Sequence, residues 1–121
     1  MQEEPKILVM GPDRNYLEAI TNREYVRKVV TDPRRGELLR ELGNPEKSYD
    51  PHDLTLYGSS EIIDATKGQG ANLLDGLAAL FELALEKARY YKADYVLLQN
   101  LDRKQCHRGY EVRASAQLLL K

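Results

Sequence analysis

The clearest alternation of hydrophobic and polar positions lies in the last third of the chain, residues 70–121. A helix is predicted to begin at Asn72, because asparagine is a favoured N-cap and hydrophobic residues recur at helical spacing after it. The main hydrophobic face comprises Leu73, Leu77, Leu80, Phe81, Ala84, Ala88 and Tyr91. Ala79, Leu83 and Tyr90 lie beyond a narrow polar strip, so we expect the helix to contact more than one surface.

Two strands are predicted after this helix, which should end within residues 92–94. Residues 95–101 are hydrophobic on both faces, as in an interior strand of a sheet. Residues 110–120 alternate between hydrophobic and polar positions, which is typical of a strand with one buried face. The polar segment 102–109 should form the turn between them, so the two strands are expected to pair as antiparallel neighbours.

The beginning of the chain gives shorter patterns. Residues 6–10 form a hydrophobic run that predicts a strand. Asn15 followed by Glu18 provides a capping box for a short helix through residue 22. Residues 25–31 fit either a strand or a continuation of that helix, and their periodicity does not separate the two.

A second helix is predicted to start at Asp32, because an aspartate N-cap is followed by a proline. Its hydrophobic stripe is Leu38, Leu39 and Leu42. Residues 46–53 are polar and predict a loop. Residues 54–65 predict a long strand with a bend or bulge at residues 58–60, where the sequence is Gly-Ser-Ser.

These elements indicate a single domain spanning residues 1–121 with an α+β fold. Residues 54–121 should form a β-α-β-β core, a small antiparallel-type sheet with one long helix packed on it. Residues 1–53 should form an N-terminal α/β extension. The alternative is a flavodoxin-like α/β sandwich, because the elements also read as alternating strands and helices.

The composition is that of a soluble globular protein, with 42% hydrophobic and 31% charged residues in a chain of 121. The net charge of −1 disfavours a dedicated polyanion binder. We expect neither a membrane span nor a signal peptide, because hydrophobic runs are short and residues 1–5 are polar. The single cysteine excludes an intramolecular disulfide and predicts a reducing, cytoplasmic location.

One candidate site is the glycine-containing segment before the long helix. Gly68, Gly70 and Asn72 lie where free backbone amides and the helix dipole can hold a phosphate or carboxylate. The dinucleotide fingerprint requires a third glycine where this chain has Leu73, and the P-loop pattern is absent from the sequence. The structural interpretation is a flexible connection between strand and helix, so no cofactor is predicted.

The second candidate is a basic hairpin tip formed by Arg103, Lys104 and Arg108, together with His107 and Arg113. Arg27, Lys28, Arg34 and Arg35 form another basic cluster. Such patches can contact phosphates, but acidic residues are interleaved with them and a solvated loop is the commoner outcome. Nucleic-acid binding is therefore the less favoured interpretation.

Neither a metal site nor a catalytic constellation is predicted. Cys106 and His107 are adjacent and His52 is distant in sequence, so they lack the spacing of a zinc site. Glu61, Asp64 and Asp75 have no histidine or nucleophile placed with them by spacing. Whether the chain is an enzyme stays open, with the sequence favouring a non-enzymatic role.

The strand-helix-strand-strand order of residues 54–121 is carried by the segments ALEKA (84–88), KADYVLL (92–98) and YEVRASA (110–116). This pattern resembles the YbjQ-like family and the C-terminal domain of the RcsF lipoproteins. The resemblance implies a small oligomer without an established enzymatic activity. The heavy-metal-binding description of the YbjQ-like family does not carry over, because this chain has no matching ligand set. RcsF-like disulfides are likewise impossible with one cysteine.

The sequence therefore favours a small non-enzymatic homo-oligomeric or interaction module. Leu83 and Tyr90 are the predicted interface residues, and Leu119 should point away from Leu118 and Leu120 toward a second uncovered surface. The alternatives are a nucleotide- or anion-binding protein that uses residues 68–72, and a nucleic-acid-binding accessory domain. Neither the small-molecule ligand nor the partner is identified by these patterns.

Overall fold

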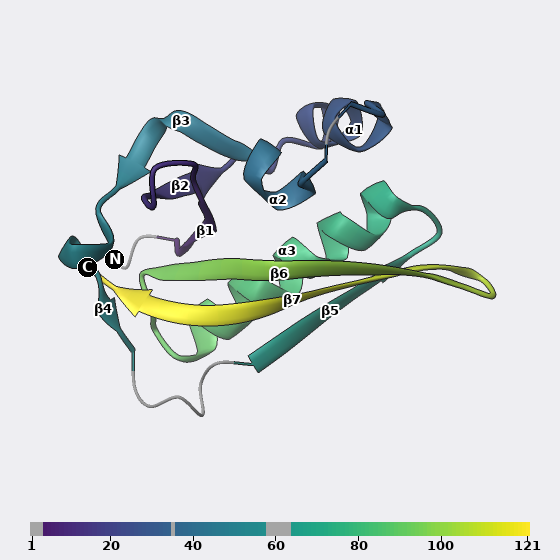
Figure 1. The fold of residues 1–121 in the computed structure, drawn as a ribbon. Helices are drawn as coiled ribbons and strands as arrows, with labels where there is room; N and C mark the ends of the chain where they lie inside the picture. The colour runs from purple at the N-terminus through teal and green to yellow at the C-terminus, as the bar shows by residue number, and fades with distance from the viewer. Residues whose placement is uncertain (1–3, 35, 58–63) are drawn as a thin grey trace.

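The computed structural model describes residues 4–34, 36–57 and 64–121, which form one mixed seven-stranded sheet with three α-helices (Figure 1). The strands are β1 Lys6–Met10, β2 Tyr16–Ala19, β3 Gly43–Tyr49, β4 Thr55–Leu56, β5 Asp64–Gly70, β6 Tyr95–Cys106 and β7 Gly109–Leu120. The helices are α1 Arg23–Thr31, α2 Leu38–Glu41 and α3 Leu73–Tyr90, with a short 3-10 helix, η1, at Pro51–Asp53.

The strand order is β3-β2-β1-β6-β7, with β4 and β5 lying end to end on the outer edge of β7. Among the described strands, the central pair β1 and β6 is parallel and the other pairs are antiparallel. The predicted β-α-β-β unit is present as β5-α3-β6-β7. The N-terminal strands are not a separate extension, because β1 joins them to the same sheet.

The predicted antiparallel pairing of residues 95–101 with residues 110–120 is confirmed. The predicted eight-residue turn is wrong, because β6 continues to Cys106 and β7 begins at Gly109. Only His107 and Arg108 form the turn. The side chains of residues 102–106 are exposed on both faces, so hydrophobic periodicity cannot reveal a strand that is held mainly by its backbone pairing.

The helix predicted from Asn15 is also wrong. This segment is β2, which pairs with β1 and places Leu17 in the core. The helix begins later, at Arg23. The side chain of Asn22 caps it by accepting hydrogen bonds from the backbone N–H groups of Glu24 and Tyr25. Residues 25–31 are helical, which settles the alternative that periodicity left open.

Asp32 does not start a helix; it is the C-cap of α1, and its side chain accepts the backbone N–H of Arg34. The predicted stripe of Leu38, Leu39 and Leu42 is nevertheless buried, around the four-residue helix α2. The predicted loop at residues 46–53 is in part strand β3, an exposed edge that pairs with β2.

The long strand predicted over residues 54–65 is instead two separate strands, β4 and β5. The predicted bend at residues 58–60 lies outside the described residues. Strand β5 runs on to Gly70, so the predicted loop containing Gly68 is wrong, and only two residues connect the strand to α3.

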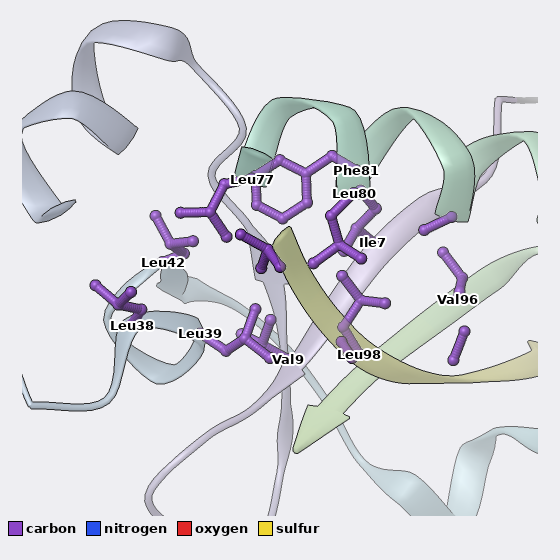
Figure 2. Packing of buried hydrophobic residues seen from close by; sticks show 14 of the residues in the cluster. Ile7, Val9, Leu38, Leu39, Leu42, Leu77, Leu80, Phe81, Val96 and Leu98 are labelled. Atoms are coloured by element: carbon purple, nitrogen blue, oxygen red, sulfur yellow. The ribbon is translucent and has the colours of Figure 1, made fainter. Parts of the chain in front are cut away.

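The larger hydrophobic core lies between one face of the sheet and all three α-helices. The face of the sheet that these helices cover is called the helical face below. Figure 2 shows its centre, where Leu77, Leu80 and Phe81 of α3 lie over β1 and β6, next to the leucines of the α2 region. Helices on a single face distinguish this arrangement from the flavodoxin-like alternative, whose sheet is covered on both faces.

A smaller cluster on the opposite face contains Leu8, Tyr95, Leu97 and Leu119. Leu119 does point away from its neighbours, as predicted. It is only 4% exposed, however, because Tyr16, Tyr49 and Leu54 pack against this cluster. The prediction of an uncovered surface at Leu119 is therefore wrong, since the N-terminal half of the chain covers it.

Candidate functional site

Gly68 and Gly70 lie where β5 and the first turns of α3 come into close contact. A Cβ atom at Gly68 would be 2.9 Å from Leu80 Cα and closer still to the carbonyl oxygen of Gly76. Because these obstacles are backbone atoms, a side chain cannot be accommodated by a rotamer change. The two glycines therefore allow the helix to lie directly on the strand.

Asn72 is the N-cap of α3, as predicted. Its side-chain oxygen accepts the backbone N–H of Asp75 at 2.9 Å. The Asp75 carboxylate itself lies in the first helical turn and forms an ion pair with Arg23 of α1. A carboxylate therefore already occupies the positive end of the helix dipole, and Gly68, Gly70 and Asn72 have structural roles here.

The basic residues of the hairpin are exposed, but they do not share one face. Lys104 is paired across the strands with Glu111, and adjacent residues in a strand point to opposite faces, so Arg103 lies on the other side. The Glu111 carboxylate also accepts hydrogen bonds from the Arg113 guanidinium, at 3.0 and 3.2 Å. Arg108 lies in the turn. Alternating charges of this kind do not form the single-sign surface that polyanion binding favours.

Of the second basic cluster, Arg27 and Lys28 are exposed on α1, and Arg34 contacts Asp32 at 3.4 Å. Arg35 lies outside the described residues. Within the described ranges, no hydrogen bond or ion pair joins Arg27, Lys28 or Arg34 to the hairpin tip.

Cys106 is an exposed free thiol at the end of β6. His52 contacts Asp50 instead, with its ring Nδ1 2.9 Å from the carboxylate. The pKa of Asp50 lies below its ordinary value. The main cause is the hydrogen bond from the backbone N–H of His52, and the hydrogen bond from the His52 side chain is the second cause. Among residues 4–34, 36–57 and 64–121, no cluster of three or more His, Cys, Asp or Glu side chains has metal-binding geometry.

The main exposed hydrophobic surface lies on the outside of α3, toward its C-terminal end. Leu83 is 38% exposed, Tyr90 80% and Tyr91 39%. With Glu86, Lys87 and Arg89 they line an open groove of about 710 Å³. These six residues are called the α3 flank below.

Aromatic contacts and one ion pair hold the α3 flank in place. The ring of Tyr91 lies edge-on to Tyr90, with centroids 5.0 Å apart, and is tilted against Tyr57 at 6.3 Å. Arg89 donates to the Glu4 carboxylate at 2.9 Å. The sequence predicted Leu83 and Tyr90 here but placed Tyr91 on the buried face. Tyr91 is the C-cap residue, so helical spacing no longer determines its direction.

The described side chains of the α3 flank provide hydrophobic contact and charge but no nucleophile placed beside a base. Of the acid/base candidates, Asp75 is paired with Arg23, and Glu61 lies outside the described residues. The side chain of Asp64 is not described either. The α3 flank thus offers a partner hydrophobic contact and charge.

Comparison of the chain with protein-family models, with curated proteins and with solved structures found no match. The resemblance of residues 54–121 to the YbjQ-like family accordingly stays a prediction. In the part of the chain that the structure describes, no helix has the length and hydrophobicity needed to cross a membrane.

Proposed function

We propose that this protein is a small non-enzymatic module that self-associates through the α3 flank. The observation that carries the proposal is the exposure of Leu83 and Tyr90 on a helix whose other hydrophobic side chains are largely buried. Exposed hydrophobic surface with a charged rim is characteristic of an interaction site. Aromatic residues at such positions contribute much of the energy of protein interfaces.

The spacing within the α3 flank fits a second copy of the same chain. Leu83 and Tyr90 are seven residues apart, with Glu86 and Lys87 between them, so all four fall on one stripe of the helix. A two-fold axis at the middle of this stripe sets Leu83 against the partner's Tyr90. The same axis sets Glu86 against the partner's Lys87, so hydrophobic and charged contacts are satisfied together.

Self-association can be tested by sedimentation velocity at micromolar concentration, where a monomer has a mass of 13.9 kDa. Wild type is expected to sediment as a dimer or a larger closed oligomer. Leu83→Lys should remain folded and become monomeric, because a charge replaces a hydrophobic contact on both sides of the interface. Gln69→Lys is the matched control, since it adds the same charge at an exposed position of β5.

A monomeric wild type would contradict the proposal. An unfolded Leu83→Lys variant would also contradict it, because Leu83 would then stabilise its own chain rather than a contact between copies.

The exposed single thiol of Cys106 supports a reducing, cytoplasmic location for this module.

Anion binding at residues 68–72 and nucleic-acid binding at the hairpin tip are alternatives with less support, given the structural roles and alternating charges described above. A thermal-shift screen with nucleotides, phosphate and oligonucleotides tests both, because a ligand that binds the folded state raises the melting temperature. A marked shift with ATP or a short oligonucleotide would favour the corresponding alternative.

A further inference from the structure

Strand β6 contains a bulge at the point where it passes the end of β1. The two strands are paired only as far as Leu98. Regular pairing of β6 with β7 stops at Gln99 and resumes at Asp102, so Asn100 and Leu101 together lie against one residue of β7. Asn100 has a φ of 55°, in the left-handed region that asparagine tolerates better than most residues.

The bulge determines which way Arg103 points. Without the extra residue, Arg103 would be paired with Glu111, on the face away from the helices. With it, Arg103 is paired with Val112, which is fully buried on the helical face. Asp102 is moved to the opposite face, across from Arg113. Bulges commonly redirect a side chain in this way beside binding sites.

A groove of about 710 Å³ lies on this side of the bulge. Its walls come from the end of β1, from residues 36–40 and from residues 98–103. Leu39, Leu98 and Leu101 supply its hydrophobic side chains, whereas Met10 is paired with Tyr16 and borders the groove with its backbone, its side chain being directed to the opposite face. The chain leaves the parallel strands β1 and β6 in opposite directions, toward β2 and β7, and ligands of α/β sheets bind in crevices at such points.

Among the described residues that line this groove, Arg103 is the cation without a partner. Glu37 forms an ion pair with Arg40 at 3.6 Å, so the charges of these two side chains neutralise each other. Asp102 also borders the groove, but the register directs its side chain to the other face. Arg103 has no side-chain hydrogen bond or ion pair with the residues of the described ranges.

We propose that this groove binds a small organic anion, a molecule with one carboxylate or phosphate group on a partly hydrophobic body. Arg103 holds the charged group, because its planar guanidinium can donate two parallel hydrogen bonds to carboxylate or phosphate oxygens. The wall around Leu39, Leu98 and Leu101 holds the hydrophobic body. The bulge at Asn100 is the local feature that makes the site.

The site can be tested by NMR titration of the ¹⁵N-labelled protein with benzoate and with phenyl phosphate. Saturable shifts are expected for the amides of Met10, Leu39, Asn100 and Arg103. Benzyl alcohol and inorganic phosphate should each bind more weakly, since one lacks the charge and the other the hydrophobic body. Whichever of benzoate and phenyl phosphate binds with the higher affinity identifies the charged group that the groove prefers.

Arg103→Gln should weaken binding about tenfold or more, because a charge-assisted hydrogen-bonded pair is lost. Lys104→Gln is the matched control; it removes the same charge from the next residue, which points to the other face, and should leave affinity unchanged. Arg103→Lys keeps the charge without the fork and should give intermediate affinity. If Arg103→Gln is poorly folded, the comparison of Arg103→Lys with Lys104→Gln still tests the role of the Arg103 guanidinium.

Absence of saturable shifts with both organic anions would overturn this assignment, as would equal weakening by Arg103→Gln and Lys104→Gln. The result is independent of self-association, because the groove and the α3 flank share no lining residue. A monomer that binds benzoate would contradict self-association and support the anion site. A dimer that binds neither anion would support self-association and contradict the anion site.

Discussion

Replacing Gly68 with alanine should destabilise the protein, because its Cβ would have to enter the contact between β5 and α3. The nearest atoms are the Gly76 carbonyl oxygen and the Leu80 amide nitrogen, followed by Leu80 Cα at 2.9 Å. Overpacking a tight interior typically costs about 1–3 kcal/mol, and backbone obstacles favour the upper part of that range. The lower entropy of the unfolded alanine chain offsets about 0.4–1 kcal/mol. A net loss of about 1–2.6 kcal/mol follows from these two terms.

The loss is measured by urea unfolding followed by far-ultraviolet circular dichroism, with linear extrapolation to water. Gly36→Ala is the matched control, because nothing lies within 4 Å of a Cβ at that position. Its stability should be unchanged or raised by up to about 1 kcal/mol. A Gly68→Ala protein as stable as wild type would refute the close contact between strand and helix, and the anion-binding interpretation of Gly68 would regain weight.

Three further outcomes follow from the local structure. Asn72→Ala should lower the free energy of unfolding by about 1 kcal/mol in the same urea assay, because the N-cap hydrogen bond of α3 is lost. The pKa of Asp50, measured by NMR, should lie below its ordinary value and stay low in His52→Ala, since the main cause is the backbone N–H of His52. Because this pKa is lowered in the folded state, any stabilisation is present above the ordinary aspartate range and is lost as the pH falls through the folded-state pKa. Cys106→Ser should not change the melting temperature in a thermal scan, as the thiol is exposed; a drop of several degrees would contradict that placement.

The sequence predicted the elements whose hydrophobic pattern persists over many residues. Helix α3 spans 18 residues with its N-cap at Asn72, and the pairing of β6 with β7 follows from two runs joined by one polar segment. Strands β2 and β3 were missed for a physical reason. Strand β2 has only four residues, and β3 has mostly exposed side chains, so neither shows a hydrophobic period. Both are held by backbone pairing.

The candidate sites show a similar division. Leu83 and Tyr90 were predicted on an exposed side of the helix, and their exposure is confirmed. Gly68 was interpreted as a loop glycine, because a missing side chain looks the same whether it admits a phosphate or a helix backbone. The bulge at Asn100 left no signal at all, since only the pairing of β6 with β7 reveals the extra residue.

Disulfide trapping between two separately prepared variants tests self-association through the α3 flank most directly. Leu83→Cys and Tyr90→Cys, each combined with Cys106→Ser, are mixed and oxidised, and the products are identified by intact mass. The proposed two-fold contact places each new cysteine against the other variant's cysteine. Identical positions lie about 10 Å apart along the helices, from the 1.5 Å rise per residue, and that exceeds the reach of a disulfide.

The predicted result is a mixed disulfide dimer that forms faster than the dimers of either variant alone. A mixture of Leu83→Cys with Gln69→Cys, in the same background, reports random collision. If the Leu83→Cys and Tyr90→Cys mixture reacts no faster than this control, the α3 flank is not the contact between two copies of the chain.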